Sequence, residues 1–348
     1  MNARVDPILS VVRPLPRVPS LESDSPREGR LELTGEFSLH HGGTLRDAVI
    51  AWRCVGPAQA PVVLALGGIS ADRHVCESPG PVRGWWGEVA GRGQALDTER
   101  VRIVSFDYLG GSGESSGPGR GERFPSLSTY DQAEVLARLL DHLGLAAVHA
   151  VIGASYGGMV ALAFGERYPE RVRQLLVIGA AERAHPMAIA WRSIQREIVR
   201  LGLSHGTADA SLALARALAL TTYRSPEEFA ARFTGAPSRE EEGFVFPVQP
   251  YLRARGRAYA AHHRPEAFLC LSESLDLHWV DAARICVPTR AVAVREDQLV
   301  PLSDVRALVA RLPAGRLHEI SSLYGHDAFL KEPDQLRSIF ASALGRLA

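Results

Sequence analysis

Short apolar runs alternate with longer amphipathic stretches along most of the chain. The apolar runs predict strands at 30–37, 47–55, 61–66, 101–106, 147–152, 174–179, 288–294 and 317–321. Some of them, such as 61–66, are continuously apolar, which is typical of strands buried on both faces of a parallel sheet. Helical patterns, as at 130–143 and 157–167, separate most of these runs. The alternation predicts an α/β fold, with a mostly parallel sheet and helices on both faces.

The stretch from 183 to 283 breaks this rhythm. Its helical patterns fall at 187–201, 208–220, 226–233, 251–262 and 268–275, and it shows no strong strand. We interpret 183–283 as a helical lid inserted into a core formed by 32–182 and 284–348. The lid is expected to roof the carboxyl edge of the sheet, where the functional groups of open α/β folds lie. Residues 1–31, rich in Pro, Arg, Ser and Glu, are expected to form a flexible tail.

A Gly-x-Ser-x-Gly motif stands where a predicted strand passes into a helix. It reads Gly153-Ala154-Ser155-Tyr156-Gly157. This is the pattern of a nucleophile elbow, a turn so tight that only glycine fits on either side of the serine. The motif alone is weak, because it arises by chance in glycine-rich chains. It predicts an acid and a histidine further along the chain.

Both partners of such a serine are present. Asp297 and His326 each follow a predicted strand, and the order Ser155, Asp297, His326 is that of α/β-hydrolase triads. Singly, the aspartate reads as a helix cap and the histidine as a surface or core residue. Together they predict a nucleophile, its general base and the acid that orients the base. The backbone N–H groups of Ile69 and Tyr156 are the expected oxyanion hole.

Composition limits the partners and the setting. The 348 residues include 39 basic and 39 acidic side chains, so no basic excess points to nucleic acid or to an anionic membrane. No stretch reaches the ~18 apolar residues that span a membrane, and the first residues lack the apolar core of a signal peptide. The four cysteines show no metal-ligand spacing. We therefore expect a cytoplasmic protein with reduced thiols and no metal.

A serine triad transfers acyl groups through an acyl-serine, but the triad leaves esterase, lipase, peptidase and acyltransferase open. Segments around the triad narrow the choice, because they resemble the homoserine O-acyltransferase family of α/β-hydrolases. The similar segments are 83–86, 94–100, 109–112, 116–118, 151–159, 192–196, 220–225, 251–252 and 324–330. The Gly-Trp-Trp at 84–86 and the Tyr-Gly-His-Asp-Ala-Phe-Leu at 324–330 are the most specific of them.

The resemblance implies transfer of an acyl group from acetyl-CoA or succinyl-CoA to the hydroxyl of L-homoserine, by a ping-pong route in methionine biosynthesis. It implies a homodimer with no cofactor beyond the acyl-CoA substrate, although the sequence shows no clear interface stripe. It also implies that Arg224 and Asp327 bind the amino acid. Elementary chemistry agrees, since a guanidinium suits an α-carboxylate and a carboxylate suits an α-ammonium group. Without the resemblance, Arg224 reads as a surface ion pair and Asp327 as a helix cap.

The chain departs from the family pattern beside the expected site. The family has His-Ala-Leu-Thr-Gly-Asp where residues 67–72 read Gly-Gly-Ile-Ser-Ala-Asp, and Gly-Ser-Met where 154–156 read Ala-Ser-Tyr. We take these departures to favour succinyl-CoA, whose free carboxylate calls for a cationic partner. The candidate partners are Arg73, Arg120, Arg123 and Arg183. Acetyl-CoA as donor and serine as acceptor stay open, because serine is only one methylene shorter. An esterase is a more distant alternative.

Overall fold

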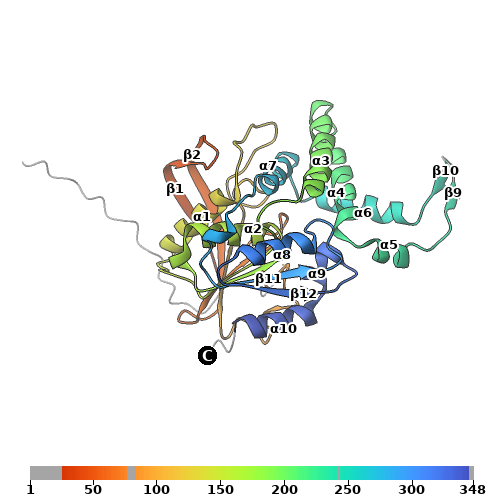
Figure 1. The fold of residues 1–348 in the computed structure, drawn as a ribbon. Coiled ribbons are helices and arrows are strands. Elements are labelled where there is room, and N and C mark those ends of the chain that lie inside the picture. The colour runs from red at the N-terminus through yellow and green to blue at the C-terminus, as the bar shows by residue number, and fades with distance from the viewer. Residues whose placement is uncertain (1–25, 77–83, 242, 345–348) are drawn as a thin grey trace, which may run out of the picture.

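An eight-stranded sheet forms the centre of the protein in the computed structural model, which describes residues 26–76, 84–241 and 243–344. The strand order is β1-β2-β6-β3-β7-β8-β11-β12 (Figure 1). The strands are β1 Arg27–Ser38, β2 Thr44–Val55, β3 Val62–Leu66, β6 Arg102–Phe106, β7 Ala150–Ala154, β8 Leu175–Ile178, β11 Thr289–Val294 and β12 Gly315–Ile320. The six from β6 to β12 run parallel, and β1 and β2 add an antiparallel edge. The predicted mostly parallel sheet is confirmed.

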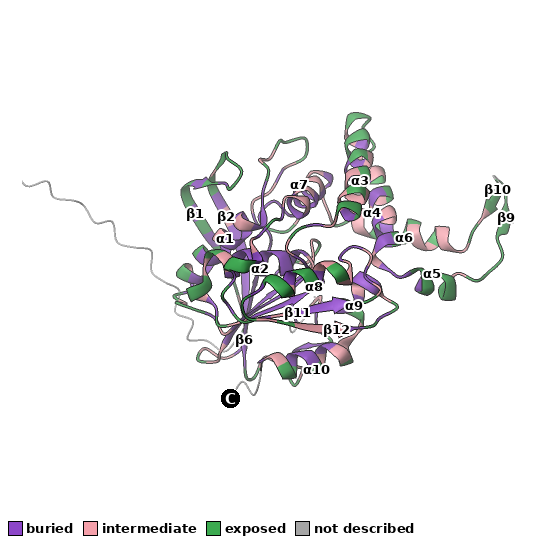
Figure 2. Ribbon diagram, viewed as in Figure 1, coloured by how far each residue is buried: buried purple, intermediate pink, exposed green. Residues whose placement is uncertain are grey.

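Helices cover both faces of the sheet, as the alternation of patterns predicted. On one face, α1 (Thr129–His142), α2 (Tyr156–Arg167) and α8 (Leu302–Arg311) enclose the larger apolar core. On the other, α10 (Pro333–Leu344) packs with Trp86 and its neighbours against the sheet. Along β3, successive side chains join different cores, with Val63 in one and Leu64 in the other. Burial on both faces explains the continuously apolar strands (Figure 2).

The lid segment lies between β8 and β11. It holds α3 (Pro186–Ser204), α4 (Ala208–Tyr223), α5 (Pro226–Arg232), α6 (Val248–Ala260) and α7 (Pro265–Asp276). It also holds a hairpin of β9 (Ser238–Glu240) and β10 (Gly243–Val245), which was not predicted from the sequence. The hairpin stands away from the core and is almost wholly exposed (Figure 2). β9 has no apolar residue, and the two in β10, Phe244 and Val245, are too few to predict a strand.

The amino-terminal boundary differs from the prediction. Residues 1–25 of the predicted tail lie outside the described residues, but β1 already begins at Arg27 and pairs with β2. The first residues of this edge strand are polar and partly exposed, and this composition predicted a tail rather than a strand. Two short strands, β4 (Ala90–Gly91) and β5 (Leu96–Asp97), and the one-turn helix α9 (Ala328–Lys331) complete the elements used below.

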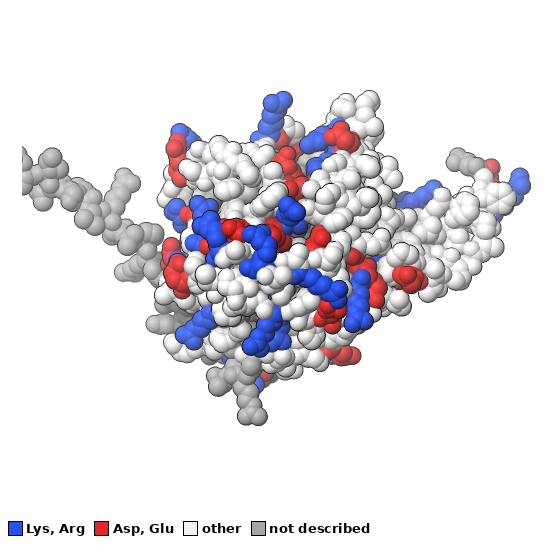
Figure 3. Space-filling view, in the orientation of Figure 1, with Lys and Arg blue, Asp and Glu red and all other residues white. Residues whose placement is uncertain are grey.

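Charged side chains of both signs lie interspersed on the face of the molecule that Figure 3 shows. Across the residues that the structure describes, no helix is both long enough and apolar enough to cross a membrane.

Candidate active site

Three predicted residues from three different strand ends meet at the carboxyl edge of the sheet. Ser155 follows β7, Asp297 follows β11 and His326 follows β12. Nε2 of His326 lies 2.8 Å from Oγ of Ser155, and Nδ1 lies 2.7 Å from Oδ2 of Asp297. The other carboxylate oxygen of Asp297 accepts the backbone N–H groups of Leu299 and Val300, at 2.8 and 3.0 Å. Asp297 is thus fixed by its own turn and in turn fixes the imidazole.

The electrostatics of His326 suit a general base. Burial lowers the pKa of this histidine, but the carboxylates of Asp297 and Asp327 together outweigh burial, so the net pKa lies above the ordinary value. With Nδ1–H donating to Asp297, the neutral ring presents Nε2 as an acceptor for the Ser155 hydroxyl. The arrangement can accept a proton from Ser155 and hold it as an ion pair with Asp297.

The turn around Ser155 requires its glycines. Ser155 has a φ of 54°, in the region that side chains other than glycine rarely adopt. A Cβ on Gly153 would lie 2.1 Å from the carbonyl oxygen of Gly157, and one on Gly157 would lie 2.2 Å from that of Leu66. The structure thus has the tight turn that the motif predicts, with glycine needed on both sides of Ser155.

The two residues expected to form the oxyanion hole lie beside Ser155. Tyr156 opens α2, and the first N–H groups of a helix have no intrahelical acceptor and sit at its positive end. The loop after β3 approaches from the other direction, since a Cβ on Gly68 would lie 3.8 Å from Cβ of Ser155. Ile69 follows in that loop and lines the same pocket as Ser155.

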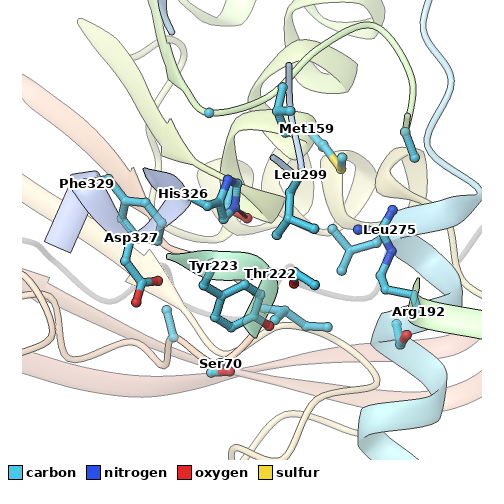
Figure 4. Close-up of a pocket in the computed structure, with 18 of the residues that line it drawn as sticks. Ser70, Met159, Arg192, Thr222, Tyr223, Leu275, Leu299, His326, Asp327 and Phe329 are labelled. Atoms are coloured by element: carbon cyan, nitrogen blue, oxygen red, sulfur yellow. Dashed lines mark hydrogen bonds between the residues drawn. The ribbon is translucent and has the colours of Figure 1, made fainter. Parts of the chain in front are cut away.

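A pocket opens above Ser155 between the core and the lid (Figure 4). The lining from the core includes Gly68, Ser70, Met159, Leu299, His326, Asp327 and Phe329, and the lining from the lid includes Arg183, Arg192, Gln195, Arg216, Thr222, Tyr223, Tyr259 and Leu275. The lid therefore supplies the cationic groups of the pocket and the core supplies the reactive ones. Among the described residues, no cluster of three or more His, Cys, Asp or Glu side chains could hold a metal ion.

Arg224 and Asp327, expected to bind an amino acid, contact each other. Nε of Arg224 donates to Oδ2 of Asp327 at 2.9 Å, and Nη1 lies 3.6 Å from Oε1 of Glu228. The Arg224 side chain is 8% exposed and its guanidinium lies over the ring of Tyr324, so it is not a surface ion pair. Asp327 borders the pocket, whereas Arg224 lies behind it. Asp327 begins α9 but makes no side-chain cap bond.

Three of the four arginines expected to bind a succinyl carboxylate do not line the pocket. Arg73 is buried and donates to Asp107, Glu114 and Glu28, so its charge is already neutralised. Arg120 is exposed beside Asp209. Arg123 is also exposed and lines a different hollow, between the core and lid helices α3 and α7. Only Arg183 borders the pocket, at its exposed rim with its guanidinium over the ring of Trp279.

Arg192 lines the pocket but was not among the arginines that the sequence suggested as partners of a succinyl carboxylate. Its Nε donates to Oδ1 of Asp276 at 2.6 Å, and the same carboxylate accepts Nη1 of Arg196 at 2.6 Å. Nη2 of Arg192 is buried and has no hydrogen-bond partner among the described residues. The segment 192–196 resembles the family, but the pattern of a lid helix does not say which residues face the core. Figure 4 shows Arg192 at the opposite side of the pocket from Asp327.

The Gly-Trp-Trp motif has a structural role that supports the site. The indole N–H of Trp86 donates to the carbonyl of Phe329 at 2.7 Å, and Trp85 stacks on Trp86. A Cβ on Gly84 would lie within 2.4 Å of the backbone of Cys76. These contacts tie the loop after β3 to the turn that carries His326. Arg83 lies outside the described residues.

Comparisons with known proteins agree with this fold and with the resemblance found in the sequence. The alpha/beta hydrolase fold family matches residues 61–333. A homoserine O-succinyltransferase of Xanthomonas campestris pv. campestris is 42% identical, over 94% of this chain and 86% of that protein. A homoserine O-acetyltransferase of Mycolicibacterium smegmatis is 32% identical, over 92% of this chain and 94% of its own. The solved homoserine O-acetyltransferase from Bacillus anthracis has a TM-score of 0.85 at 17% identity, covering 93% of this chain and 99% of that one, which shows a shared fold.

Proposed function

Because the chain belongs to the homoserine O-acyltransferase family of α/β-hydrolases, we propose that it transfers a succinyl group from succinyl-CoA to the hydroxyl of L-homoserine. The products are O-succinylhomoserine and CoA, in methionine biosynthesis. The enzyme is an acyltransferase. The observation that carries the choice of donor is Arg192, whose buried Nη2 lacks a partner in the described part of the pocket.

In the first half-reaction, Oγ of Ser155 attacks the thioester carbonyl while Nε2 of His326 takes its proton. Asp297 stabilises the imidazolium that forms. The oxyanion lies between the N–H groups of Tyr156 and Ile69, each of which is worth about 3 kcal/mol in the transition state. The C–S bond then breaks, His326 returns the proton to the sulfur, and CoA leaves succinyl-Ser155.

In the second half-reaction, the homoserine hydroxyl attacks the ester carbonyl of succinyl-Ser155. His326 takes the hydroxyl proton and returns it to Oγ of Ser155 as the product ester forms. Asp327 receives the α-ammonium group, and Arg224 holds Asp327 in place through its 2.9 Å bond. Binding the amino acid at this end of the pocket positions its hydroxyl ahead of water.

The charges around Arg192 support the succinyl donor. Two guanidinium groups, of Arg192 and Arg196, share the single carboxylate of Asp276, which leaves one net positive charge at this side of the pocket. Burying a cation without a counter-charge is costly, and a succinyl carboxylate would supply that charge with a charge-assisted bond. An acetyl group would leave the Nη2 donor of Arg192 unpaired. This is why we prefer succinyl-CoA to acetyl-CoA.

We extend the proposal to the setting of the enzyme, which we place in the cytoplasm as a homodimer with acyl-CoA as substrate and no resident cofactor. The thiols of Cys54, Cys76, Cys270 and Cys286 are free, which suits a reducing compartment. On α3 the side chains of Met187, Ile194 and Leu201 are each more than half exposed. Their spacing of seven places them along one helix face, a stripe that fits a second copy of the chain.

The test is CoA release from acetyl-CoA or succinyl-CoA, each with L-homoserine or L-serine. The proposal expects release that depends on the amino acid and is fastest for succinyl-CoA with homoserine. Mass spectrometry should find a succinyl adduct on the wild-type enzyme and none on Ser155→Ala. Release that ignores the amino acid would identify an ester or thioester hydrolase instead. An adduct on Ser155→Ala would refute the nucleophile.

A further inference from the structure

We propose that Arg73 is a positioning residue for acyl transfer, because it fixes the loop that presents the backbone N–H of Ile69 to the oxyanion. This loop is residues 67–73, which follow β3. Arg73 acts through the loop and does not touch the substrate, since it does not line the pocket. The inference rests on the proposed function only in that Ser155 must form an acyl-enzyme, whatever the donor and the acceptor are.

Two consecutive residues after β6 hold the two ends of the loop. At its start, the carbonyl of Gly67 accepts the hydroxyl of Tyr108 at 2.7 Å and the backbone N–H of Gly157, in the elbow, at 2.9 Å. At its end, Oδ1 of Asp107 accepts the backbone N–H of Arg73 at 2.8 Å, and Oδ2 accepts Nη1 of the same arginine at 2.7 Å. The path of the loop is therefore set at both ends.

The middle of the loop is not embedded in the core. Ile69 and Ala71 are half buried and Ser70 is exposed. All three border the pocket above Ser155 and also a second hollow, of about 160 Å³, behind the loop. Because packing leaves these residues room to move, the position of the Ile69 N–H depends on the contacts at the ends of the loop.

The Arg73 side chain is a buried cation enclosed by carboxylates. It is 9% exposed, and its partner Asp107 is 1% exposed. Nη2 donates to Glu114 at 2.9 Å and to Glu28 at 3.2 Å. Burial opposes the charge of Arg73, but these three carboxylates outweigh burial and raise its pKa. Movement of the loop away from Asp107 would leave a buried carboxylate without its counter-charge, which is costly, so the pair stiffens this end of the loop.

The N–H groups of Ile69 and Tyr156 are free to bind an oxyanion. Among the described residues, neither N–H donates to another group of the protein. Such donors stabilise the transition state only when they are already placed at hydrogen-bond distance from the developing charge. A displacement of about 1 Å can slow the reaction about 100-fold. An anchor that prevents this displacement therefore contributes to the rate.

The experiment is single-turnover acylation of Arg73→Met over a range of succinyl-CoA concentrations. The rate constant should fall by about 10- to 100-fold, while the apparent dissociation constant of succinyl-CoA stays within about twofold. Deacylation by homoserine should slow by a similar factor, because the same oxyanion hole serves both steps.

A transition-state analogue reports on the oxyanion hole directly. Oγ of Ser155 adds to the carbonyl carbon of 1,1,1-trifluoropentan-2-one, His326 takes the hydroxyl proton, and the carbonyl oxygen becomes an oxyanion. Across the variants, the affinity for this ketone should weaken by the same factor as the acylation rate. A purely structural role for Arg73 would not link the two.

Matched variants separate position from charge and from stability. Tyr108→Phe releases the other end of the loop without changing a charge, and should slow acylation and weaken ketone binding together. Arg73→Lys keeps the charge without the planar fork, and should recover part of both losses. Arg30→Met is the control, because Arg30 is exposed beside the same Glu114, and it should change neither. Urea unfolding of each variant measures the accompanying loss of stability.

Three outcomes would overturn the assignment. A lower urea midpoint in Arg73→Met with unchanged acylation would make the residue structural only. Slower acylation with unchanged affinity for the ketone would place its effect outside the oxyanion hole. A shift in the acid midpoint of His326 in Arg73→Met, absent in Tyr108→Phe, would mean that Arg73 acts through its charge. A wild-type enzyme that forms acyl-Ser155 but releases CoA without regard to homoserine would instead refute the proposed function and not this assignment.

Discussion

The hydroxyl of Tyr156 lies 2.7 Å from Oγ of Ser274, which links the residue after the candidate nucleophile to lid helix α7. Tyr156 is wholly buried, and its ring packs edge-on against Tyr108. The hydroxyl of Tyr108 in turn donates to the carbonyl of Gly67 at 2.7 Å, in the loop that carries Ile69, the other residue expected in the oxyanion hole. One chain of contacts therefore joins the elbow, the loop after β3 and the lid, at a position where the chain departs from its family pattern.

Substitution of either Tyr156 or Ser274 should lower the stability of the fold by the loss of the same hydrogen bond. Tyr156→Phe and Ser274→Ala should each lower the free energy of unfolding by about 1 kcal/mol, because each leaves one buried hydroxyl partner unpaired or absent. The double variant should lose little more than either single one. Urea unfolding of all four proteins measures the coupling. Losses that simply add would show that the two hydroxyls do not interact.

Substitution of Arg192 should change the preferred donor. Arg192→Met removes the proposed partner of the succinyl carboxylate, so acylation by succinyl-CoA should slow by about 10- to 100-fold while acylation by acetyl-CoA stays within a few-fold. Stopped-flow release of CoA in a single turnover measures both rates.

Arg200→Met is the matched control for this variant, because Arg200 lies on the same helix, exposed beside Glu197. It should leave both donors unaffected. If Arg192→Met slowed the two donors equally, Arg192 would have no part in choosing between them.

The local parts of the site were predictable from sequence, because each leaves a short-range signal. Gly153 and Gly157 mark the elbow, since a Cβ at either would meet backbone within 2.2 Å. Asp297 and His326 follow strands, and the parallel topology brings such strand ends to one edge. The core strands were predictable for the same reason, since burial on both faces leaves a continuous apolar run.

The charge pairing inside the pocket could not be predicted in the same way. Arg73 looked like a candidate for the donor, yet its partners Glu28, Asp107 and Glu114 come from distant parts of the chain and meet only in the folded sheet. Arg192 depends on how α3 is rotated against the core, which the weak pattern of a lid helix does not fix. Which arginine has an unpaired N–H group therefore depends on carboxylates that are far away in the sequence.

The rate of acylation should fall with acid because His326 must be neutral to accept the Ser155 proton. Burial lowers the pKa of His326, but the carboxylates of Asp297 and Asp327 together raise it by more, so the acid limb should have its midpoint above the ordinary value of 6.5. Asp297→Asn removes the carboxylate that opposes burial most strongly, so the midpoint should move to lower pH while the rate itself drops by about 10⁴-fold. Single-turnover acylation over a range of pH measures both effects. An unmoved midpoint would mean that another group controls the limb.

The free energy of unfolding should also depend on pH through His278, which takes no part in the proposed acyl transfer. His278 is buried, with Nε2–H donating to the carbonyl of Ala181 at 3.1 Å and Nδ1 accepting the hydroxyl of Thr129 at 2.8 Å. Burial lowers its pKa from 6.5 to about 4. Below pH 6.5 the unfolded chain binds a proton at this histidine and the folded protein does not. The stability that His278 contributes is therefore present above pH 6.5 and is lost as the pH falls toward 4.

The whole loss through His278 amounts to about 3 kcal/mol at the acid end, since each unit of difference in pKa is worth about 1.4 kcal/mol. His278→Gln keeps a polar side chain but cannot titrate, so it should be less stable than the wild type at neutral pH and lose less stability as the pH falls. Urea unfolding of both proteins at a series of pH values gives the two slopes. The difference between the slopes isolates His278 from the other titrating groups, which the two proteins share. Parallel curves would show that His278 takes up its proton over the same pH range in the folded protein as in the unfolded chain.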